Sequence, residues 1–286
     1  MSRIDVHKTY KLYIGGKFPR TESGRYYAVN DSKGNFLANM CLGSRKDFRN
    51  AVVVARKAQS SWAGASALNK GQILYRIAEM LEGRKAQFIN ELMAQGATKP
   101  KAIEEVNTSI DRLVYYAGWS DKYQQFFSSV NPVASSHFNF SCLEPMGVIA
   151  MIAPEEQSLL GLVSVIAPAI VGGNTVIVLA SENKPLCSIS FAEVLNSSDV
   201  PGGVVNILTG KREELKSHMA SHMDVNAVVY CGQNSDDIAL INELASNNLK
   251  RVIIHKKHDW LNAECQSPYL IEKTQEVKTT WHPTKV

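Results

Sequence analysis

Residues 144–210 read EPMGVIAMIAPEEQSLLGLVSVIAPAIVGGNTVIVLASENKPLCSISFAEVLNSSDVPGGVVNILTG. Three apolar runs rich in β-branched residues lie within this stretch, at Val148–Ile152, Thr175–Leu179 and Val204–Leu208. Helical patterns separate the runs, which is typical of βαβ units in a parallel sheet covered on both faces. Because sites in such sheets lie at the carboxyl ends of the strands, we expect ligand chemistry at the turns after Ile152, Leu179 and Tyr230.

The same alternation continues toward the C-terminal end of the chain. Ala227–Tyr230 is predicted as a fourth strand, Asp236–Asn247 as a helix, and Arg251–His255 as a fifth strand. The fold class that follows is α/β, a Rossmann-like doubly wound parallel sheet of about five strands.

Helical periodicity dominates the region before the sheet. Ser44 and Asp47 lie three residues apart and predict a capping box at the start of the first helix. Asn69 is predicted to cap the second helix, and Lys85–Ala94 continues as a third. A long helix is expected to carry the apolar residues from Ile103 to Ala117.

Two segments show the period of two that is typical of strands. His137–Leu143 (HFNFSCL) alternates and predicts a β-arm. Tyr269–Trp281 reads as one extended strand, in which every second residue from Ile271 to Trp281 shares a face. Both faces of that strand are half polar, which favours a position at the edge of a sheet.

Composition excludes several classes of function. The net charge of +4 is not gathered in a basic stripe, so we expect no nucleic-acid partner. The five cysteines are scattered without a CxxC, which argues against a disulfide framework or a structural zinc site. No apolar stretch reaches membrane-spanning length and no secretion signal is visible, so we expect no membrane partner and a cytoplasmic location.

Short motifs along the chain point to a known family. They include LYIGGKF (12–18), GATKP (96–100), YYAGWSDK (115–122), EPMGVIAMIAP (144–154), PGGVVNILTG (201–210) and NNLKRV (247–252). In this order they resemble the NAD(P)-dependent aldehyde dehydrogenase superfamily, almost continuously from about residue 11 to 255. The tail YLIEKTQEVKTTW (269–281) resembles the C-terminal oligomerisation strand of that family.

The resemblance implies a division of the chain into parts. Residues 1–130 and 146–262 would form a coenzyme-binding-type domain, and residues 131–145 and 266–286 an oligomerisation β-arm. Members of the family continue after the fifth strand into a large catalytic domain. Only 31 residues follow His255 here, so we expect that catalytic domain to be absent.

The catalytic positions implied by the resemblance hold other residues. Glu156 replaces an asparagine whose amide helps to bind the oxyanion, and a carboxylate there would repel negative charge. His255 replaces the general-base glutamate. No cysteine stands in the context of the family's nucleophile, and Cys265 is the only late one. We therefore expect no catalytic residues.

The coenzyme positions are altered as well. Leu179 replaces a lysine that would hold the adenosine part, whereas Glu182, which would accept from ribose hydroxyls, is kept. In the turn after the fourth strand Gly232 is kept, Gln233 replaces a serine, and Asp237 replaces a second glycine. Asp236 and Asp237 would repel phosphates while suiting the start of a helix. We expect no cofactor, or NAD or NADP bound only weakly through Glu182 and Gly232.

Two pairs of polar residues have alternative interpretations. Glu155 and Glu156 could be a general acid/base pair, but stabilisation of the next helix N-terminus is the favoured interpretation. His218 and His222 have the spacing of a zinc pair, but without a third ligand a solvated helix face is favoured, and no metal is expected.

The sequence supports two hypotheses of function. The first is an aldehyde dehydrogenase-like protein without catalysis, which acts as an oligomerising or partner subunit. It would form a homo-oligomer, or a hetero-oligomer with an active aldehyde dehydrogenase, through residues 137–143 and 269–281. The alternative is an NAD(P)-dependent aldehyde oxidoreductase or nucleotide sensor with an atypical site.

Overall fold

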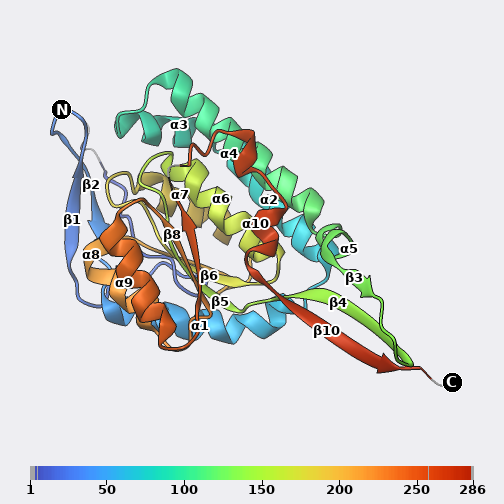
Figure 1. Cartoon of the computed structure of the whole chain (residues 1–286). Coiled ribbons are helices and arrows are strands. Elements are labelled where there is room, and N and C mark those ends of the chain that lie inside the picture. Colours follow the sequence, from blue (N-terminus) through green and yellow to red (C-terminus); the bar gives the residue numbers. More distant parts are fainter. Residues whose placement is uncertain (1–3, 5, 257, 285–286) are drawn as a thin grey trace.

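A five-stranded parallel sheet lies at the centre of the molecule, and the computed structural model describes residues 4, 6–256 and 258–284 (Figure 1). The order of its strands is β7-β6-β5-β8-β9. Their bounds are β5 (Val148–Ile152), β6 (Thr175–Leu179), β7 (Val205–Leu208), β8 (Ala227–Cys231) and β9 (Arg251–His255). The α/β class and the five parallel strands predicted from the sequence are thereby confirmed.

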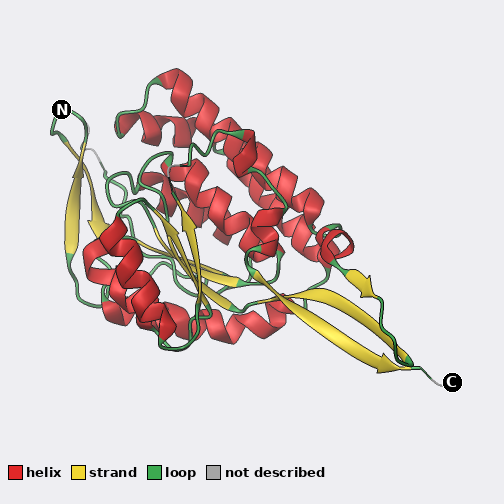
Figure 2. Cartoon of the chain, in the orientation of Figure 1, coloured by secondary structure: helices red, strands yellow, loops and turns green. Residues whose placement is uncertain are grey.

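Helices cover both faces of this sheet (Figure 2). The crossover helices are α6 (Ser158–Val171), α7 (Leu186–Asn196), α8 (Arg212–Ser221) and α9 (Ser235–Ser246). Alternate residues of β5 belong to two separate cores: Ile149 and Met151 pack with α6 and α7, whereas Ala150 and Ile152 pack with α1 and α8. Every residue of α6 is buried, because this helix is apolar on all sides and lies between the sheet and a further layer of helices.

That further layer comes from the N-terminal half of the chain. It contains α2 (Ala67–Gly83), α3 (Lys85–Ala94), α4 (Lys99–Trp119) and the short α5 (Tyr123–Phe127), while α1 (Arg45–Ala63) lies on the opposite face of the sheet. The capping box of Ser44 and Asp47 is confirmed at the start of α1. The predicted cap at Asn69 is wrong: Ser66 caps α2, and its hydroxyl accepts from the Asn69 amide at 3.1 Å.

Two antiparallel units stand at opposite ends of the molecule (Figure 1). The hairpin of β1 (Tyr26–Asn30) and β2 (Phe36–Cys41) lies near the N-terminus. The arm consists of β3 (Ser129–Asn131), β4 (His137–Pro145) and β10 (Gln275–Pro283), in the order β10-β4-β3, and it extends away from the helices with the C-terminus at its tip (Figure 2).

The tail differs from the single strand that its alternation predicted. After the 3-10 turn η1 (Ala263–Cys265), Tyr269–Glu272 forms the helical turn α10, and only Gln275–Pro283 is a strand. The helical turn buries the Ile271 side chain completely in the larger core, whereas a strand would have left it on the exposed face of the arm. The predicted boundaries at residues 1–130, 146–262, 131–145 and 266–286 stay predictions, and residues 1–3, 5, 257, 285 and 286 lie outside the described residues.

Candidate functional site

The carboxyl edge of the parallel sheet is where a ligand site is expected, and its turns carry many charged side chains. The turns after β5, β6 and β8 were predicted from the sequence. The structure adds the turn after β7, where Lys211 and Arg212 stand at the start of α8. The rule that ligands gather at carboxyl ends of strands applies equally to this turn, so it could have been found from the sequence.

Glu155, in the turn after β5, is bound entirely by neighbouring turns. Its carboxylate accepts from the Ser181 hydroxyl at 2.8 Å and from the backbone amides of Glu182 and Asn183 at 3.2 and 3.0 Å. Arg212 Nε lies 2.5 Å from Glu155 Oε1, an ion pair without hydrogen-bond alignment. Glu155 therefore joins the turns after β5, β6 and β7 into one polar network.

Glu182, the residue predicted to accept from a ribose, already has two partners in this network. Lys211 Nζ donates to one carboxylate oxygen at 2.6 Å, and the Arg212 amide donates to the other at 3.0 Å. Burial acts to raise the pKa of Glu182, but these two donors hold the pKa below its ordinary value. The carboxylate is thus charged and fully engaged within the chain.

The turn after β8 is filled by a tyrosine. A Cβ atom built on Gly232 would lie 2.6 Å from the ring of Tyr230, so the phenol covers this glycine. The Tyr230 hydroxyl donates to Asp237 at 2.9 Å, and Lys216 binds the other oxygen of Asp237. Burial, together with the Asp237 carboxylate, raises the pKa of Tyr230 to about 12.

These residues do not fit the pyrophosphate and ribose of a dinucleotide. The phenol of Tyr230 lies where a phosphate would approach the Gly232 backbone, and Asp237 adds negative charge beside it. Leu179, at the end of β6, is fully buried and offers no donor. Asp236 and Asp237 lie in the first turn of α9, but the residue that caps this helix is Asn234. Its side chain accepts from the backbone amides of both aspartates.

The two replaced catalytic positions lie apart at this edge. Glu156 is largely exposed and pairs with Lys184 in the turn after β6. His255 ends β9 and is only 7% exposed; its Nδ1 lies 3.0 Å from His258 Nε2, and its ring packs against Trp260. Burial lowers the pKa of His255 to about 4, so the ring is neutral near pH 7.

The favoured interpretation of Glu155 and Glu156 as stabilisers of the α6 N-terminus is wrong. Glu105, from α4, provides this function: its carboxylate accepts from the amides of Leu159 and Leu160 at 2.9 and 3.3 Å. Gln157, the residue before α6, has a left-handed backbone and makes no side-chain cap. The cap comes from a residue more than fifty positions away, which local sequence patterns cannot show.

Comparison with known proteins identifies the family. A family model described as "Aldehyde dehydrogenase family" matches residues 18–256. The chain belongs to the aldehyde dehydrogenase family. The resemblance stated from the motifs is thereby confirmed.

Aldehyde dehydrogenase relatives match most of this chain but extend well beyond it. Cytosolic 10-formyltetrahydrofolate dehydrogenase of Mus musculus is 28% identical over 88% of this chain and 29% of its own length. Omega-crystallin of Enteroctopus dofleini is 29% identical over 85% of this chain and 50% of its own length. The chain thus spans between about a third and a half of the length of these relatives.

Solved structures agree with the family fold. PnpE from Pseudomonas sp. WBC-3 superposes with a TM-score of 0.82 and 26% identity, covering 86% of this chain and 50% of that one. An aldehyde dehydrogenase from Bacillus cereus gives a TM-score of 0.83 at 22% identity over 87% of this chain and 51% of that one, which supports the fold alone.

Two buried thiols of this aldehyde dehydrogenase-family chain, Cys265 and Cys187, lie in unreactive surroundings. Cys265 is 8% exposed, its Sγ lies 3.4 Å from the Asp259 carbonyl, and burial raises the pKa of its thiol. Cys187 is fully buried, and desolvation raises its pKa further. A raised pKa keeps the thiol protonated, whereas a nucleophile needs the thiolate.

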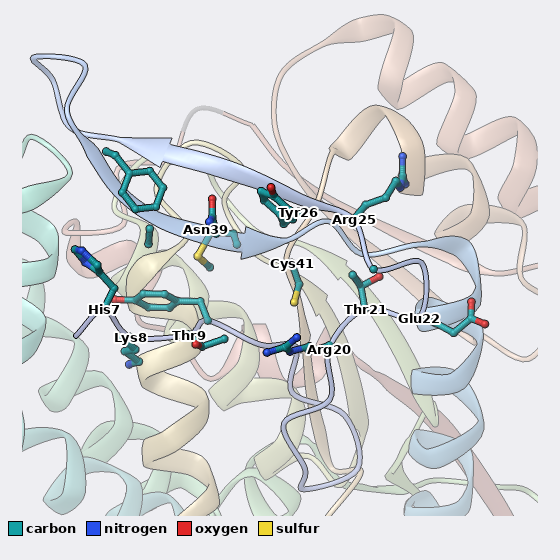
Figure 3. Close-up of a pocket in the computed structure, with 15 residues that line it drawn as sticks. His7, Lys8, Thr9, Arg20, Thr21, Glu22, Arg25, Tyr26, Asn39 and Cys41 are labelled. Atoms are coloured by element: carbon teal, nitrogen blue, oxygen red, sulfur yellow. The ribbon is translucent and has the colours of Figure 1, made fainter. Parts of the chain in front are cut away.

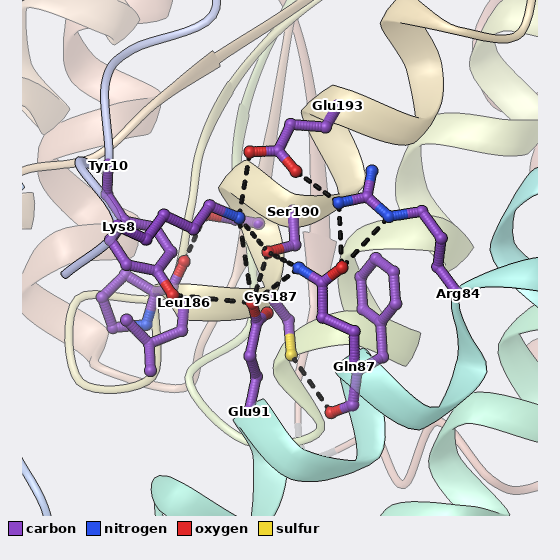
Figure 4. Close-up of polar contacts among 12 residues, drawn as sticks. Lys8, Tyr10, Arg84, Gln87, Glu91, Leu186, Cys187, Ser190 and Glu193 are labelled. Carbon is purple, nitrogen blue, oxygen red and sulfur yellow. Dashed lines mark hydrogen bonds and ion pairs between the residues drawn. The ribbon is translucent and has the colours of Figure 1, made fainter. Parts of the chain in front are cut away.

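Cys187 lies beneath a polar cluster that fixes the N-terminal segment (Figure 4). Lys8 Nζ lies 2.9 Å from Glu193 of α7 and donates to Ser190 at 2.8 Å, and Ser190 in turn donates to Glu91 of α3 at 2.6 Å. Arg84 binds Glu193 from the opposite side. These contacts join three segments distant in sequence, which is a structural role.

The hairpin of β1 and β2 covers a cavity of about 520 Å³ (Figure 3). Its lining combines the aromatic rings of Tyr10, Tyr26 and Phe36 with the basic side chains of Lys8, Arg20 and Arg25. Lys8 and Arg25 already pair with Glu193 and Glu214.

Within the described residues no three His, Cys, Asp or Glu side chains converge as metal ligands. His218 lies in α8, while His222 follows its end and packs edge-on against Phe48. Among the helices described, none is both long and apolar enough to cross a membrane.

Proposed function

We propose that this chain is a member of the aldehyde dehydrogenase family without catalytic activity, which acts by assembling through its arm. The arm is the observation that carries the proposal. Its strands β3 and β10 hold apolar side chains in water: Val130 is 69% exposed, Val277 65% and Trp281 57%. Apolar residues gathered on one protruding element indicate a surface that another chain covers.

The backbone of the arm supports the same proposal. β10 pairs with β4 over nine residues, from Gln275 opposite Pro145 to Pro283 opposite His137. β10 is the edge of this sheet in the described part of the chain, so its outer amides and carbonyls are available to a further strand. A small sheet without a covering layer is marginal alone, and a second chain would bury its faces.

The partner is proposed to be a second copy of this chain or an active aldehyde dehydrogenase. The surface comprises residues 137–143 and 275–281, because residues 269–272, included in the sequence prediction, form α10 instead of a strand. Strand addition at the exposed edge of β10 would supply backbone hydrogen bonds, and Val277 and Trp281 would supply apolar contact.

Loss of catalysis is supported by the altered site. Glu156 is bound to Lys184, His255 is a buried neutral imidazole hydrogen-bonded to His258, and Cys265 is a protonated thiol. None of the three supplies an oxyanion donor, a general base at the family position, or a thiolate.

Light scattering after size-exclusion chromatography tests the proposal. We expect the wild-type protein to have a mass at least twice that of one chain, or to form a complex with an active aldehyde dehydrogenase when the two are mixed. The double variant Val277→Ser/Trp281→Ser should shift to the monomer. Val53→Ser, which alters a residue 61% exposed on α1, is the matched control and should keep the wild-type mass. A wild-type monomer that captures no dehydrogenase would refute the proposal.

The second candidate is an NAD(P)-dependent aldehyde oxidoreductase or a nucleotide sensor. Glu182 and Gly232 favour it, because both lie at the carboxyl edge where the family binds its coenzyme. Calorimetric titration with NAD and NADP measures binding, and an aldehyde oxidation assay measures turnover. Turnover that Cys265→Ser abolishes would establish this candidate and exclude the first.

A further inference from the structure

The cavity beneath the hairpin of β1 and β2 is a candidate site for a small molecule. Its volume of about 520 Å³ is within the range of sites that hold such ligands. Its walls come from the segments 7–10 and 20–26 and from β2. The cavity is therefore separate from the carboxyl edge of the parallel sheet and from the arm.

The register of the hairpin places aromatic and polar side chains on one wall. Tyr26 of β1 is paired with Cys41 of β2, so their side chains lie on the same face, and Asn39 shares this face because side chains alternate along β2. Tyr27 points to the opposite face, where Lys211 Nζ lies 5.6 Å from the centre of its ring. Tyr26 and Asn39 thus line the cavity and do not contribute to the packing beneath the hairpin.

Two of the aromatic rings in the lining are accessible to a ligand. The Tyr26 ring is 67% exposed, and that of Phe36 is 50% exposed. Large aromatic side chains that remain exposed inside a cavity indicate a surface that a ligand covers. A flat ring is the occupant that gains most from such a surface, because aromatic rings stack on one another.

The lining also presents a cation to a ligand. Arg20 is exposed, and no carboxylate of the described residues forms an ion pair with its guanidinium. Figure 3 shows this guanidinium across the cavity from β2, with the sulfur of Cys41 facing it. The other charged residues of the lining pair with residues outside it: Lys8 with Glu193, Arg25 with Glu214 and Glu22 with Lys46.

The charge of Arg20 selects the anionic group of the ligand. A guanidinium binds a carboxylate through two parallel hydrogen bonds, and the two charges neutralise each other. A phosphate dianion would leave negative charge that no further unpaired cation of the described lining balances.

We propose that this cavity binds an aromatic carboxylate. The carboxylate pairs with Arg20, and the flat ring stacks on Tyr26. The proposal does not depend on the arm or on assembly, and it does not involve the carboxyl edge of the parallel sheet.

Calorimetric titration with three compounds of similar size tests this assignment. 2-Naphthoate has a flat ring system and a carboxylate, 2-naphthamide is neutral, and decahydro-2-naphthoate keeps the charge without the flat ring. We expect 2-naphthoate to bind at least about tenfold more tightly than 2-naphthamide, because the amide lacks the charge-assisted contact. It should bind at least about threefold more tightly than decahydro-2-naphthoate, which cannot stack. Absence of 2-naphthoate binding, or an affinity no higher than that of either analogue, would overturn the proposal.

Two variants locate the binding, each with a matched control. Arg20→Gln should weaken 2-naphthoate binding at least about tenfold and leave that of 2-naphthamide unchanged. Arg49→Gln, at an exposed arginine of α1, should bind as the wild type does. Tyr26→Leu should weaken binding of both naphthalene compounds at least about threefold, whereas Tyr75→Leu, at a tyrosine of α2 that is 59% exposed, should have no effect. Because Arg20 and Tyr26 are exposed, both variants should keep the thermal midpoint of the wild type. Unchanged affinity for 2-naphthoate in either variant would refute the assignment.

Discussion

The carboxyl edge of the parallel sheet and the arm handle their exposed groups in opposite ways. At the edge, the carboxylates of Glu155, Glu182 and Asp237 each have a cation of the same chain as a partner. Backbone amides complete the first two, and the Tyr230 hydroxyl completes the third. On the arm, Val277 and Trp281 face water, and the outer side of β10 has no neighbouring strand in the described part of the chain. The charged groups of the carboxyl edge have partners within the chain. The apolar side chains and the outer strand of the arm would be covered only by another chain.

This difference shows where the polar groups at the carboxyl edge find their partners. A phosphate or ribose normally satisfies donors at the carboxyl edge of such a sheet. Here Lys211, Tyr230 and Arg212 instead contact the carboxylates of Glu182, Asp237 and Glu155 in the same chain. The arm then is the region through which the chain is expected to act.

We expect the largest effect on stability when the pH is lowered, because His255 at the carboxyl edge is buried as a neutral ring. Burial first, and then the positive charges of His258 and Lys273, lower its pKa to about 4 from a value of 6.5. The unfolded chain therefore binds a proton that the folded chain does not. Stability is complete above pH 6.5 and falls by about 3 kcal/mol between pH 6.5 and 4.

Urea unfolding at several pH values measures this loss. His255→Gln should flatten the profile between pH 6.5 and 4. His282→Gln, on the exposed arm, should leave the profile as it is in the wild type. A wild-type profile that is flat in this window would contradict the buried neutral state of His255.

Removal of Arg212 should produce the next largest effect. Arg212→Ala leaves Glu155 and the Ala153 carbonyl without their cation, and a lost charged partner at a largely buried site costs about 2 kcal/mol. Arg251→Ala removes an exposed pair with Glu276 and a hydrogen bond to the Gln275 carbonyl at the base of the arm, and should cost no more than about 1 kcal/mol. Chemical denaturation measures the free energy of unfolding of the two variants. Equal losses would show that ion pairs at the carboxyl edge stabilise the protein no more than those of the arm.

A smaller effect is expected for the phenol that covers Gly232. Tyr230→Phe removes the hydrogen bond to Asp237, whose other oxygen stays bound to Lys216, and should cost about 1 kcal/mol. Tyr75→Phe alters an exposed hydroxyl on α2 and should have no effect on the unfolding free energy. If Tyr230→Phe is neutral too, the turn after β8 is less tightly closed than the structure indicates.

The smallest effect is predicted on the arm. Lys278 of β10 pairs with Glu144 of β4 at 2.7 Å. The Lys278 side chain is 59% exposed and that of Glu144 is 50% exposed. Solvent screens such a pair, so Lys278→Ala should leave the denaturation midpoint unchanged. A clear shift of the midpoint would indicate that the arm is stabilised by its own ion pairs.

Much of the fold could be predicted from the sequence because the apolar periodicity is local. The five parallel strands and the capping box at Ser44 follow from such patterns. The helical turn α10 could not be predicted, because the burial of Ile271 depends on a core that the local alternation does not reveal.

The polar site was harder to predict than the core. Glu182 and Gly232 were correctly placed near the carboxyl edge, but their partners Lys211 and Tyr230 were not recognised. Contacts such as that of Glu105 with the α6 amides join residues far apart in sequence, so only the folded chain shows them.

Hydrogen–deuterium exchange of the whole chain, measured at increasing protein concentration and with added NAD, tests the central claim most directly. We expect peptides covering residues 137–145 and 275–283 to become protected as concentration rises, while NAD leaves the turns at Glu182 and Gly232 unchanged. Protection of those turns by NAD, with an arm that exchanges equally at every concentration, would refute assembly through the arm.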